Sequence, residues 1–469
     1  MSEKIYYEDI ICAKATPSGA SAVAVIRVSG KDCWKILNTI FRSFNNKNIV
    51  FKSHRAYYGY IVDNEIVIDN VLVITFANGR SFTGEESFEI HCHGSDLIST
   101  LIINLLIKNG CRLAEPGEFS KRAFLNGKID LTEAEAIMDL VNASTKEAAI
   151  IASRQLNGLV KQEINSIKEK ISDLLASIEV FIDYPDEDLK VNIEEWLKEL
   201  SEISILLTNL LKGFERGKFY RESITAVLVG KTNSGKSTIF NYLLNEDKAI
   251  VSDIHGTTRD YLDGVINVKG YGVRIYDTAG LRETEDPIEL EGTKRSKQLA
   301  ANSDIILYVV DVEKGLTEED KENLLKLGID KKIIVILNKE DKLDEESIRK
   351  KIDSIQNSLV NFKKLKICSM SALNKKGIEN FNEIFLSLLI GGEKKGDMDS
   401  SLITNIRHAN LIELSLKNIA KAFENISYGI LDIGAFEIRE ALNRLGEMTG
   451  EVRREDILNR IFSKFCVGK

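Results

Sequence analysis

The sequence lacks the features of secreted and membrane-spanning proteins. Its six cysteines, spread over 469 residues, have no repeated spacing, which indicates free thiols in a reducing compartment rather than a disulfide framework. The first residues carry acids where a signal peptide needs positive charge. The most apolar stretch, residues 97–107, is broken by polar residues and falls short of the ~18 residues of a membrane span. We therefore expect a cytoplasmic protein with a core helix there and no membrane segment.

Excess positive charge is also missing. The chain has 63 basic and 71 acidic residues, a formal net charge of −8, so bulk electrostatics alone does not suggest nucleic-acid binding. Any RNA contact must be a local patch. Internal repeats and low-complexity tracts are absent too, and the length predicts two to four domains at roughly 150 residues each.

The secondary-structure pattern changes twice along the chain. Residues 1–126 mix β-branched runs with a helical stretch and predict an α+β domain. Residues 221–391 alternate short strands with helices, as a doubly wound, mostly parallel sheet does. Helical patterns occupy residues 127–220 and 392–469. The simplest organisation is therefore an all-helical, discontinuous domain with an α/β domain inserted in it.

Two details of the first helical segment can be predicted. Thr132 with Glu135 three residues later fits a capping box at a helix start. A second helix is expected from Trp196 to Phe214, ending near Gly213 and Gly217. Between them one apolar stripe steps by alternating four and three residues, at Val160, Ile164, Ile167, Ile171, Leu174 and Ile178.

A phosphate-binding loop lies in the inserted domain. In "ITAVLVGKTNSGKSTIFN" a buried strand leads into Gly230-x-x-x-x-Gly235-Lys236-Ser237 and then a helix. Glycines let backbone N–H groups surround phosphates, Lys236 neutralises β- and γ-oxygens, and the Ser237 hydroxyl can bind Mg²⁺. The flanking strand and helix argue against a chance match.

Two further strand ends indicate the nucleotide. "IYDTAG" ends in Asp277, which can hold Mg²⁺ through water, followed by Gly280 at the γ-phosphate. "IIVILNKED" resembles the NKxD element of GTPases, in which an Asp carboxylate accepts from guanine N–H groups that adenine lacks. Together these favour GTP. Many GTPases place a water-orienting Gln directly after this Gly, but here Leu281 follows, so any such polar group must come from elsewhere.

With these motifs in order, the chain resembles the MnmE (TrmE) family of tRNA-modification GTPases from about residue 8 to 469. "ATPSGASAVAVIRVSG", "SFTGEE" and "PGEFSKRAFLNGKIDLTEAEAI" are similar to the family's N-terminal signatures, "HGTTRD" to its switch I, and "FCVGK" to its C-terminal C-x-G-K. The resemblance implies a tetrahydrofolate-binding domain at 1–126, a helical domain at 127–220 and 392–469, and a GTPase domain at 221–391.

The resemblance also implies the ligands of the GTPase domain. A K⁺ ion, held by Asn233, Ser252, Ile254 and Thr257, would replace an arginine finger, and Mg²⁺ would be bound by Ser237 and Thr258. Asn233 can equally be explained by the turn geometry that Asn tolerates. The implied GTP contacts are Asn233, Ser234, Gly235, Lys236, Ser237, Thr238, Ser252, Asp253, Ile254, His255, Gly256, Thr257, Thr258, Asp277, Thr278, Ala279, Gly280, Asn338, Lys339, Asp341, Ser371 and Ala372.

Glu289 is the family's candidate for orienting the attacking water, in a register fixed by Gly292. Without the resemblance it would be one surface acid among several. In the N-terminal domain Arg27, Glu85, Lys128 and Lys469 would hold 5-formyl- or 5,10-methylene-tetrahydrofolate. Two readings of Cys466 stay open, a catalytic thiol near the one-carbon unit and a buried structural cysteine. The "HCHG" stretch at residues 91–94 fits a strand better than a metal site.

The expected function is K⁺-activated GTP hydrolysis that drives installation of a (carboxymethyl)aminomethyl group at C5 of the tRNA wobble uridine (U34). The family's partners would be tRNA, a second copy in a homodimer, and an FAD-dependent protein of the MnmG (GidA) type in a heterotetramer. An outside redox partner is needed because no G-x-G-x-x-G fingerprint follows a strand here. The alternatives are a non-catalytic GTP switch that binds RNA or ribosomes, and a dimerising scaffold.

Overall fold

The computed structural model describes residues 9–44, 49–184, 192–222, 224–246, 262–277, 299–390, 403–452 and 455–468. Contacts within the chain divide it into two compact units. The N-terminal unit comprises residues 1–138 and 445–469, and the central unit comprises residues 139–444. Each unit has its own core, so each is described by itself.

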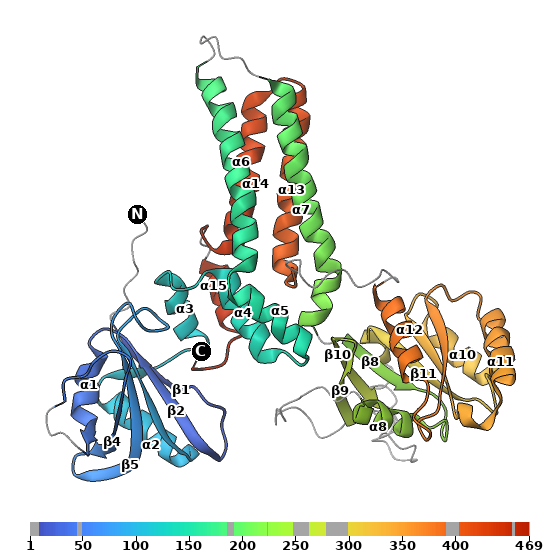
Figure 1. The fold of residues 1–469 in the computed structure, drawn as a ribbon, viewed down its shortest axis with the longest axis horizontal. Helices are drawn as coiled ribbons and strands as arrows, with labels where there is room; N and C mark the ends of the chain where they lie inside the picture. Colours follow the sequence, from blue (N-terminus) through green and yellow to red (C-terminus); the bar gives the residue numbers. More distant parts are fainter. Residues whose placement is uncertain are drawn as a thin grey trace. The chain divides into compact units, whose positions relative to one another are not determined.

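A seven-stranded sheet forms the N-terminal unit, in the order β3-β4-β5-β6-β2-β1-β7 (Figure 1). Its neighbours pair antiparallel except β1 with β7. The strands are β1 (Ile10–Lys14), β2 (Ser21–Ser29), β3 (Phe41–Ser43), β4 (Arg55–Asp63), β5 (Ile66–Phe76), β6 (Ser87–Gly94) and β7 (Cys111–Leu113).

Side-chain alternation along the strands builds the core of this unit. On β2 the buried side chains Ala24, Ile26 and Val28 share one face, as the two-residue period of a strand requires. They pack with residues of helices α1 (Cys33–Ile40) and α2 (Asp96–Lys108). The core helix expected at residues 97–107 is therefore confirmed, within α2.

Two short helices and the C-terminal segment complete the N-terminal unit. In α3 (Glu118–Leu125) Phe124 packs with Phe462 of α15 (Glu455–Phe462) and with Phe465 beyond it. Helix α4 (Leu131–Asn142) begins next to this cluster. The segment 462–466 therefore lies close to residues 117–125, although more than 300 residues separate the two along the chain.

The start of α4 corrects one expectation. Asp130, not Thr132, caps the helix: its Oδ1 accepts from Glu133 N at 2.7 Å, and Glu133 Oε2 accepts from Asp130 N at 2.8 Å. The reciprocal bonding of a capping box is present, but two residues earlier than expected. Asp130 with Glu133 and Thr132 with Glu135 both have the spacing of a capping box. The helix begins directly after Asp130, so the first pair forms the cap.

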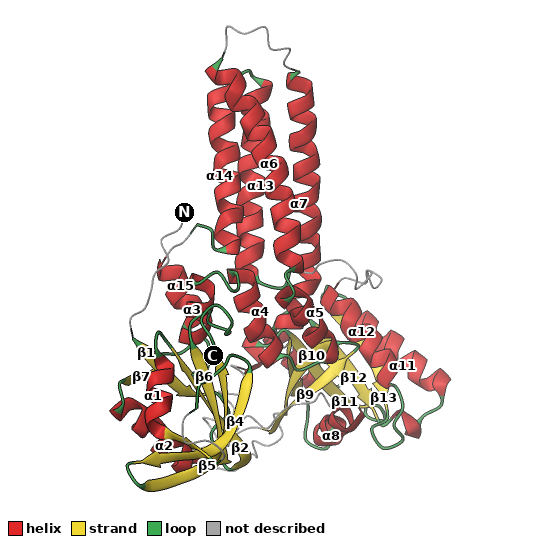
Figure 2. Ribbon diagram, turned by 60° about the vertical axis from the view of Figure 1, so that its left-hand side comes forward, coloured by secondary structure: helices red, strands yellow, loops and turns green. Residues whose placement is uncertain are grey.

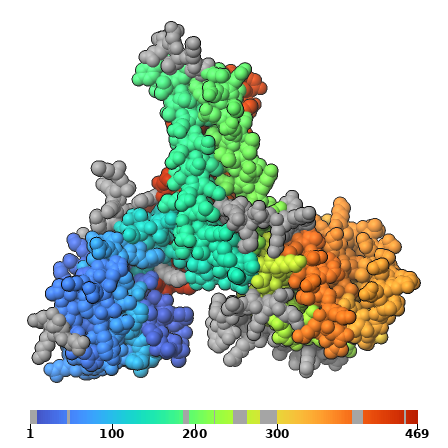
Figure 3. Space-filling model, in the orientation of Figure 1, coloured from blue at the N-terminus to red at the C-terminus, as the bar shows by residue number. Residues whose placement is uncertain are grey.

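In the central unit, long helices α6 (Leu159–Asp183), α7 (Ile193–Arg221), α13 (Ile406–Ser427) and α14 (Leu431–Thr449) run side by side (Figure 1). The expected stripe of α6, from Val160 to Ile178, is buried. Side chains of α6 and α7 close over the space between their ribbons (Figure 3). Helix α5 (Lys146–Leu156) precedes them. None of the helices among the described residues is long and apolar enough to cross a membrane.

Helix α7 is longer than expected. It continues through Gly213 and Gly217 to Arg221. A Cβ on Gly217 would lie 2.2 Å from the carbonyl oxygen of Ile403, so this glycine allows a close backbone approach rather than ending the helix.

A six-stranded sheet lies between α7 and α13 in the sequence, in the order β13-β12-β11-β8-β10-β9 (Figure 2). Its neighbours are parallel except β9 with β10. Its elements are β8 (Ile224–Val229), α8 (Lys236–Glu246), β9 (Leu262–Val268), β10 (Tyr271–Asp277), β11 (Ile305–Asp311), α10 (Glu318–Leu327), β12 (Ile333–Asn338), η2 (Glu340–Lys342), α11 (Glu345–Ser358), β13 (Leu365–Met370) and α12 (Ile378–Ile390).

Helices cover both faces of this sheet. Residues of α8 and α12 belong to one apolar cluster, and residues of α10 and α11 belong to the other. The doubly wound, mostly parallel sheet inserted in a helical segment is therefore confirmed, and ligands of such sheets bind at the carboxyl ends of the strands. The exact domain boundaries stay a prediction.

Candidate functional site

The loop between β8 and α8 has the backbone shape of a phosphate-binding loop. Gly230 and Gly235 have φ of +148° and +91°. A Cβ would lie 2.3 Å from Val309 O at the first glycine and 2.1 Å from Asn338 Nδ2 at the second. Both positions therefore need glycine. The N–H of Ser234 donates to Lys231 O at 3.3 Å, and the start of α8 is where N–H groups can meet an anion.

Lys236 and Ser237 lie at the helix start. The Lys236 ammonium is buried and donates to the carbonyl oxygens of Gly230 at 2.7 Å and Lys231 at 2.8 Å. Ser237 Oγ donates to Asp277 Oδ2 at 2.9 Å, at the end of β10. A hydroxyl and a carboxylate this close are the hard oxygen donors that Mg²⁺ prefers, so the residues fit this ion.

Two other loop residues face different surroundings. Ser234 Oγ is buried, and no described residue hydrogen-bonds to it, so it is a polar atom that a ligand oxygen could satisfy. Asn233 has φ of +64° and an exposed side chain, while its carbonyl accepts from Lys339 Nζ at 3.3 Å. The turn geometry accounts for an Asn here and leaves its amide open to solvent. Thr238 is exposed on the first turn of α8.

The Asn-Lys-x-Asp stretch begins at the last residue of β12 and contacts the same loop. Asn338 Nδ2 donates to Ser234 O at 2.9 Å, and Lys339 Nζ donates to Asp311 Oδ2 at 2.6 Å. Burial raises the pKa of Asp311, but hydrogen bonds from Lys339 and from the N–H of Glu313 outweigh it, so the pKa is lowered. Asp311, at the end of β11, was missed in the sequence, although its place at a parallel strand's carboxyl end is a signal for it.

Asp341 is held by the next loop. Ser371 Oγ donates to the Asp341 carboxylate and accepts from Asn374 N at 3.1 Å. The Ser371 backbone forms an antiparallel bridge with Lys376, and Ala372 follows it. The structure therefore brings together Asp341 and Ser371, both expected to contact GTP, with the carboxylate orientation fixed by the serine hydroxyl.

Several expected residues lie outside the described part of the chain. They are Ser252, Asp253, Ile254, His255, Gly256, Thr257, Thr258, Thr278, Ala279, Gly280, Glu289 and Lys469.

In the N-terminal unit the C-terminal tail, residues 466–468, lies against the sheet. Cys466 O accepts from Gly117 N at 3.4 Å, and Gly468 O accepts from Arg27 Nη1 at 3.4 Å. Gly468 has φ of +97°, and a Cβ there would lie 2.4 Å from Lys14 O on β1. The last glycine is therefore required by both backbone conformation and space.

Arg27 is fixed from several sides. Its Nε donates to Glu89 Oε1 at 2.9 Å, across from it on β6. The guanidinium carbon lies 5.7 Å from the ring centroids of both Phe82 and Phe119, within the range of cation–π attraction. The Arg27 side chain is about one quarter exposed, so the fixed cation can still meet a ligand.

Glu85 lies in the loop before β6, and Lys128 lies in the turn after α3. Ser29, two residues along β2 on the same face, donates from Oγ to Glu85 Oε2 at 2.7 Å. A Cβ on Gly84 would lie 3.1 Å from Lys128 Cγ, and Lys128 Nζ donates to Gly79 O at 3.2 Å. The structure thus joins Arg27 to the tail and Ser29 of the same strand to Glu85, while Lys128 lies beside Gly84.

Cys466 differs from the other cysteines. Cys12, Cys33, Cys92, Cys111 and Cys368 are buried, whereas Cys466 is exposed. The interpretation of Cys466 as a buried structural residue is therefore wrong, because its side chain is exposed although Gly468, two residues on, is buried. An exposed thiol at this place is accessible to a ligand.

The "HCHG" residues lie on β6. Cys92 is buried on one face, and His93 is exposed on the other with Nδ1 2.6 Å from Asp69 Oδ1. Among the described residues there is no group of three or more His, Cys, Asp or Glu that could hold a metal. The strand placement matches the sequence expectation.

A phosphate-binding loop at the carboxyl ends of a parallel sheet, closed by an Asn-Lys-x-Asp stretch, defines a P-loop GTPase. Family models add the rest: "GTP-binding protein TrmE N-terminus" matches residues 10–128, and "MnmE helical domain" matches residues 131–466. The chain therefore belongs to the MnmE (TrmE) family.

Curated relatives agree over the whole length. The chain is 41% identical to the tRNA modification GTPase MnmE of Acetivibrio thermocellus over 469 residues, covering 99% of this chain and 100% of that protein. It is also 41% identical to the tRNA modification GTPase MnmE of Carboxydothermus hydrogenoformans over 467 residues, covering 98% of this chain and 100% of that protein. Among solved structures, a Tyr-to-Ala variant of Aquifex aeolicus Era bound to GDP and AlF₄⁻ is 28% identical over 41% of this chain and 66% of that chain, with a TM-score of 0.29.

Proposed function

We propose that this chain hydrolyses GTP to drive modification of the tRNA wobble uridine. In detail, it is a K⁺-activated GTPase that, with an FAD-dependent partner of the MnmG (GidA) type, installs a (carboxymethyl)aminomethyl group at C5 of U34. The carbon comes from a tetrahydrofolate one-carbon unit. The chain acts in the cytoplasm as a homodimer.

One observation carries the folate part of the proposal. The exposed Cys466 and the Gly468 carbonyl lie on the same unit as Arg27, Glu85 and Lys128. Arg27 and Lys128 suit the glutamate carboxylates of a reduced folate, and Glu85 can accept from the donor edge of its pterin. When bound, the folate supplies the one-carbon unit; the chain's residues bind and orient it. A GTP switch that catalyses no modification would not explain why the C-terminal tail is held beside Arg27.

The GTPase part rests on the loop geometry. The N–H groups of residues 235–237 and the Lys236 ammonium bind phosphates, and Asp341, oriented by Ser371, reads the guanine edge. Ser237 and Asp277 would hold Mg²⁺, directly and through water, with Thr258 as a second direct ligand. Mg²⁺ neutralises charge on the transferring phosphoryl group.

The proposed sites of K⁺ and of the attacking water include residues that lie outside the described part of the chain. Asn233, with its exposed amide, is proposed to bind K⁺ together with Ser252, Ile254 and Thr257, and Glu289 is proposed to orient the water that Leu281 cannot. The ion would stabilise negative charge that develops in the transition state.

Reconstitution tests the proposal. The full-length chain is mixed with an MnmG-type protein, unmodified tRNA, GTP, methylene-tetrahydrofolate and a nitrogen donor in KCl, and modified U34 is quantified by nucleoside mass spectrometry. The proposal expects modification that is lost when either GTP or the folate is omitted. Modification that persists without folate would refute the one-carbon source, and GTP hydrolysis without any modification would favour the switch.

A further inference from the structure

A buried arginine, Arg122, connects the candidate folate site to the core of the N-terminal unit. Its side chain, on α3, is fully buried. The Nη2 atom donates to Asp9 Oδ1 at 2.8 Å and to Glu118 Oε1 at 2.9 Å. The Nη1 atom donates to the carbonyl oxygen of Asp9 at 3.0 Å. The guanidinium plane is thereby fixed by three oxygens that are not part of the candidate site.

The same guanidinium reaches Glu85. Arg122 Nη1 lies 3.2 Å from Glu85 Oε1, while Ser29 Oγ donates to Glu85 Oε2 at 2.7 Å. Thr83 Oγ1 lies 2.7 Å from Ser29 Oγ and fixes that hydroxyl in turn. Both oxygens of the Glu85 carboxylate are therefore held, and its side chain is only 13% exposed.

The charge balance shows what this contact does. Arg122 and Arg112 both bond to Asp9 and Glu118, so two cations face two carboxylates. Burial raises the pKa of Glu118, but hydrogen bonds from Arg112, the N–H of Glu115 and Arg122 outweigh it, and the pKa is lowered. Glu85 is a third carboxylate, and neither of the two arginine charges is left over to neutralise it. Arg122 therefore orients Glu85 while the negative charge of Glu85 stays available to a ligand.

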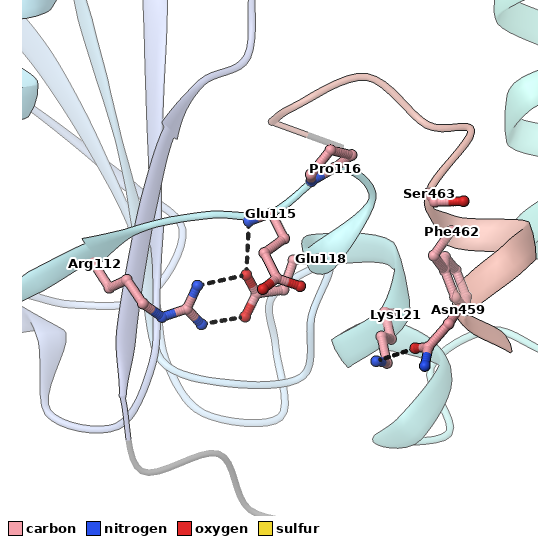
Figure 4. A pocket seen from close by; sticks show the side chains of 8 residues that line it. All are labelled: Arg112, Glu115, Pro116, Glu118, Lys121, Asn459, Phe462 and Ser463. Atoms are coloured by element: carbon pink, nitrogen blue, oxygen red, sulfur yellow. Dashed lines mark hydrogen bonds and ion pairs between the residues drawn. The ribbon is translucent and has the colours of Figure 1, made fainter. Parts of the chain in front are cut away.

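Arg112 provides an internal comparison. It bonds to Glu118 Oε1 at 2.6 Å and Oε2 at 3.1 Å, in a cavity of about 460 Å³ where Lys121 donates to Asn459 at 2.9 Å (Figure 4). The bonds that the structure records for Arg112 go to Asp9, Glu118 and the carbonyl oxygen of Leu113, not to Glu85. The two arginines thus share carboxylate partners, but the contact with Glu85 belongs to Arg122.

We propose that Arg122 is a positioning residue for reduced-folate binding: it fixes the Glu85 carboxylate in the orientation that accepts the donor edge of the pterin. The proposal rests on the proposed function, because it takes Glu85 as a ligand of the folate. Arg122 itself is buried and does not touch the folate.

The test measures binding of 5-formyl-tetrahydrofolate to the full-length chain by titration calorimetry. The variants are Arg122→Gln, Arg122→Lys, Glu85→Gln and the Arg122→Gln/Glu85→Gln double variant. Arg122→Gln is expected to weaken binding about tenfold or more, and Arg122→Lys, which keeps the charge without the planar fork, by less. In the Glu85→Gln background Arg122→Gln is expected to cause little further loss, because the two residues act as one unit.

Arg112→Gln is the matched control. It removes a cation from the same carboxylates and is expected to bind 5-formyl-tetrahydrofolate within about threefold of the wild type. Equal weakening by Arg112→Gln would mean that general disturbance of the network, not orientation of Glu85, causes the loss, and would overturn the proposal. Full additivity of Arg122→Gln with Glu85→Gln would overturn it as well.

Folding is followed by thermal melting of each variant. If Arg122→Gln does not fold, Arg122→Lys replaces it in the cycle, and wild-type affinity of the lysine variant refutes the proposal. Failure of the wild-type chain to bind the folate refutes the proposed function instead. Binding by wild type with unchanged affinity in the Arg122 variants refutes only the positioning role.

Discussion

Replacing Gly468 by alanine is expected to detach the C-terminal tail without unfolding the protein. At φ of +97° a residue with a Cβ is strained by about 1–3 kcal/mol. The new methyl group would also lie 2.4 Å from the carbonyl oxygen of Lys14, closer than Cβ atoms approach backbone oxygens. Because the residue is next to the end of the chain, moving the tail relieves both effects.

The expected loss of U34 modification can be estimated from the weaker docking of the C-terminal tail. Each ~1.4 kcal/mol reduces the docking equilibrium constant about tenfold, so the strain alone predicts roughly a 5- to 150-fold smaller constant. The hydrogen bond from Arg27 to the Gly468 carbonyl is lost with it. In the reconstituted system U34 modification should fall by up to this factor, whereas GTP hydrolysis, which uses the central unit, should stay at the wild-type rate.

Val467→Ala is the matched control for this prediction. Its side chain is 46% exposed, and alanine keeps the backbone conformation. We expect modification close to the wild-type rate. A wild-type rate for Gly468→Ala, or an equal loss for Val467→Ala, would show that the conformation of the tail does not matter for the chemistry.

Three further predictions concern the nucleotide site. Asp341→Asn should weaken GTP binding and favour xanthosine triphosphate in competition assays, because an amide donor replaces the carboxylate acceptor; unchanged guanine selectivity would mean that another residue reads the base. Hydrolysis should be much faster in KCl than in NaCl, and Asn233→Ala should remove this preference while nucleotide affinity persists; equal wild-type rates in the two salts would exclude the K⁺ site. Glu289→Ala should lower turnover by about tenfold or more with GTP affinity retained, and normal turnover would assign the water to another group.

Local patterns predicted the inserted sheet and much of the nucleotide site. Gly230, Gly235 and Lys236 are close in the sequence, and strand–helix alternation fixes where they lie, so their meeting with Asn338 follows from the parallel topology. The helix ends were less predictable. Gly217 fits a helix end in the sequence, but its role is to let the Ile403 backbone approach α7.

Tertiary contacts account for what the sequence did not reveal. The expectation that the tail meets Arg27 came from family resemblance, because no local pattern connects residues 27 and 468. Arg122 was missed since "SKRAF" reads as an ordinary amphipathic turn, and only burial beside Glu85 and Glu118 distinguishes it from the neighbouring Lys121. Two overlapping capping patterns begin at Asp130 and at Thr132. The sequence alone does not distinguish them, and in the structure Asp130 forms the cap of α4.

Deleting residues 466–468 together with Lys469 tests the central claim most directly, because it removes the tail from the candidate folate site and leaves the nucleotide site intact. U34 modification and K⁺-stimulated GTP hydrolysis are measured on the same truncated protein, with its FAD-dependent partner supplied. The account predicts that modification is abolished while GTP hydrolysis continues at nearly the full rate. Normal modified-uridine levels would contradict it, and a parallel loss of GTP hydrolysis would show that the tail holds the fold instead.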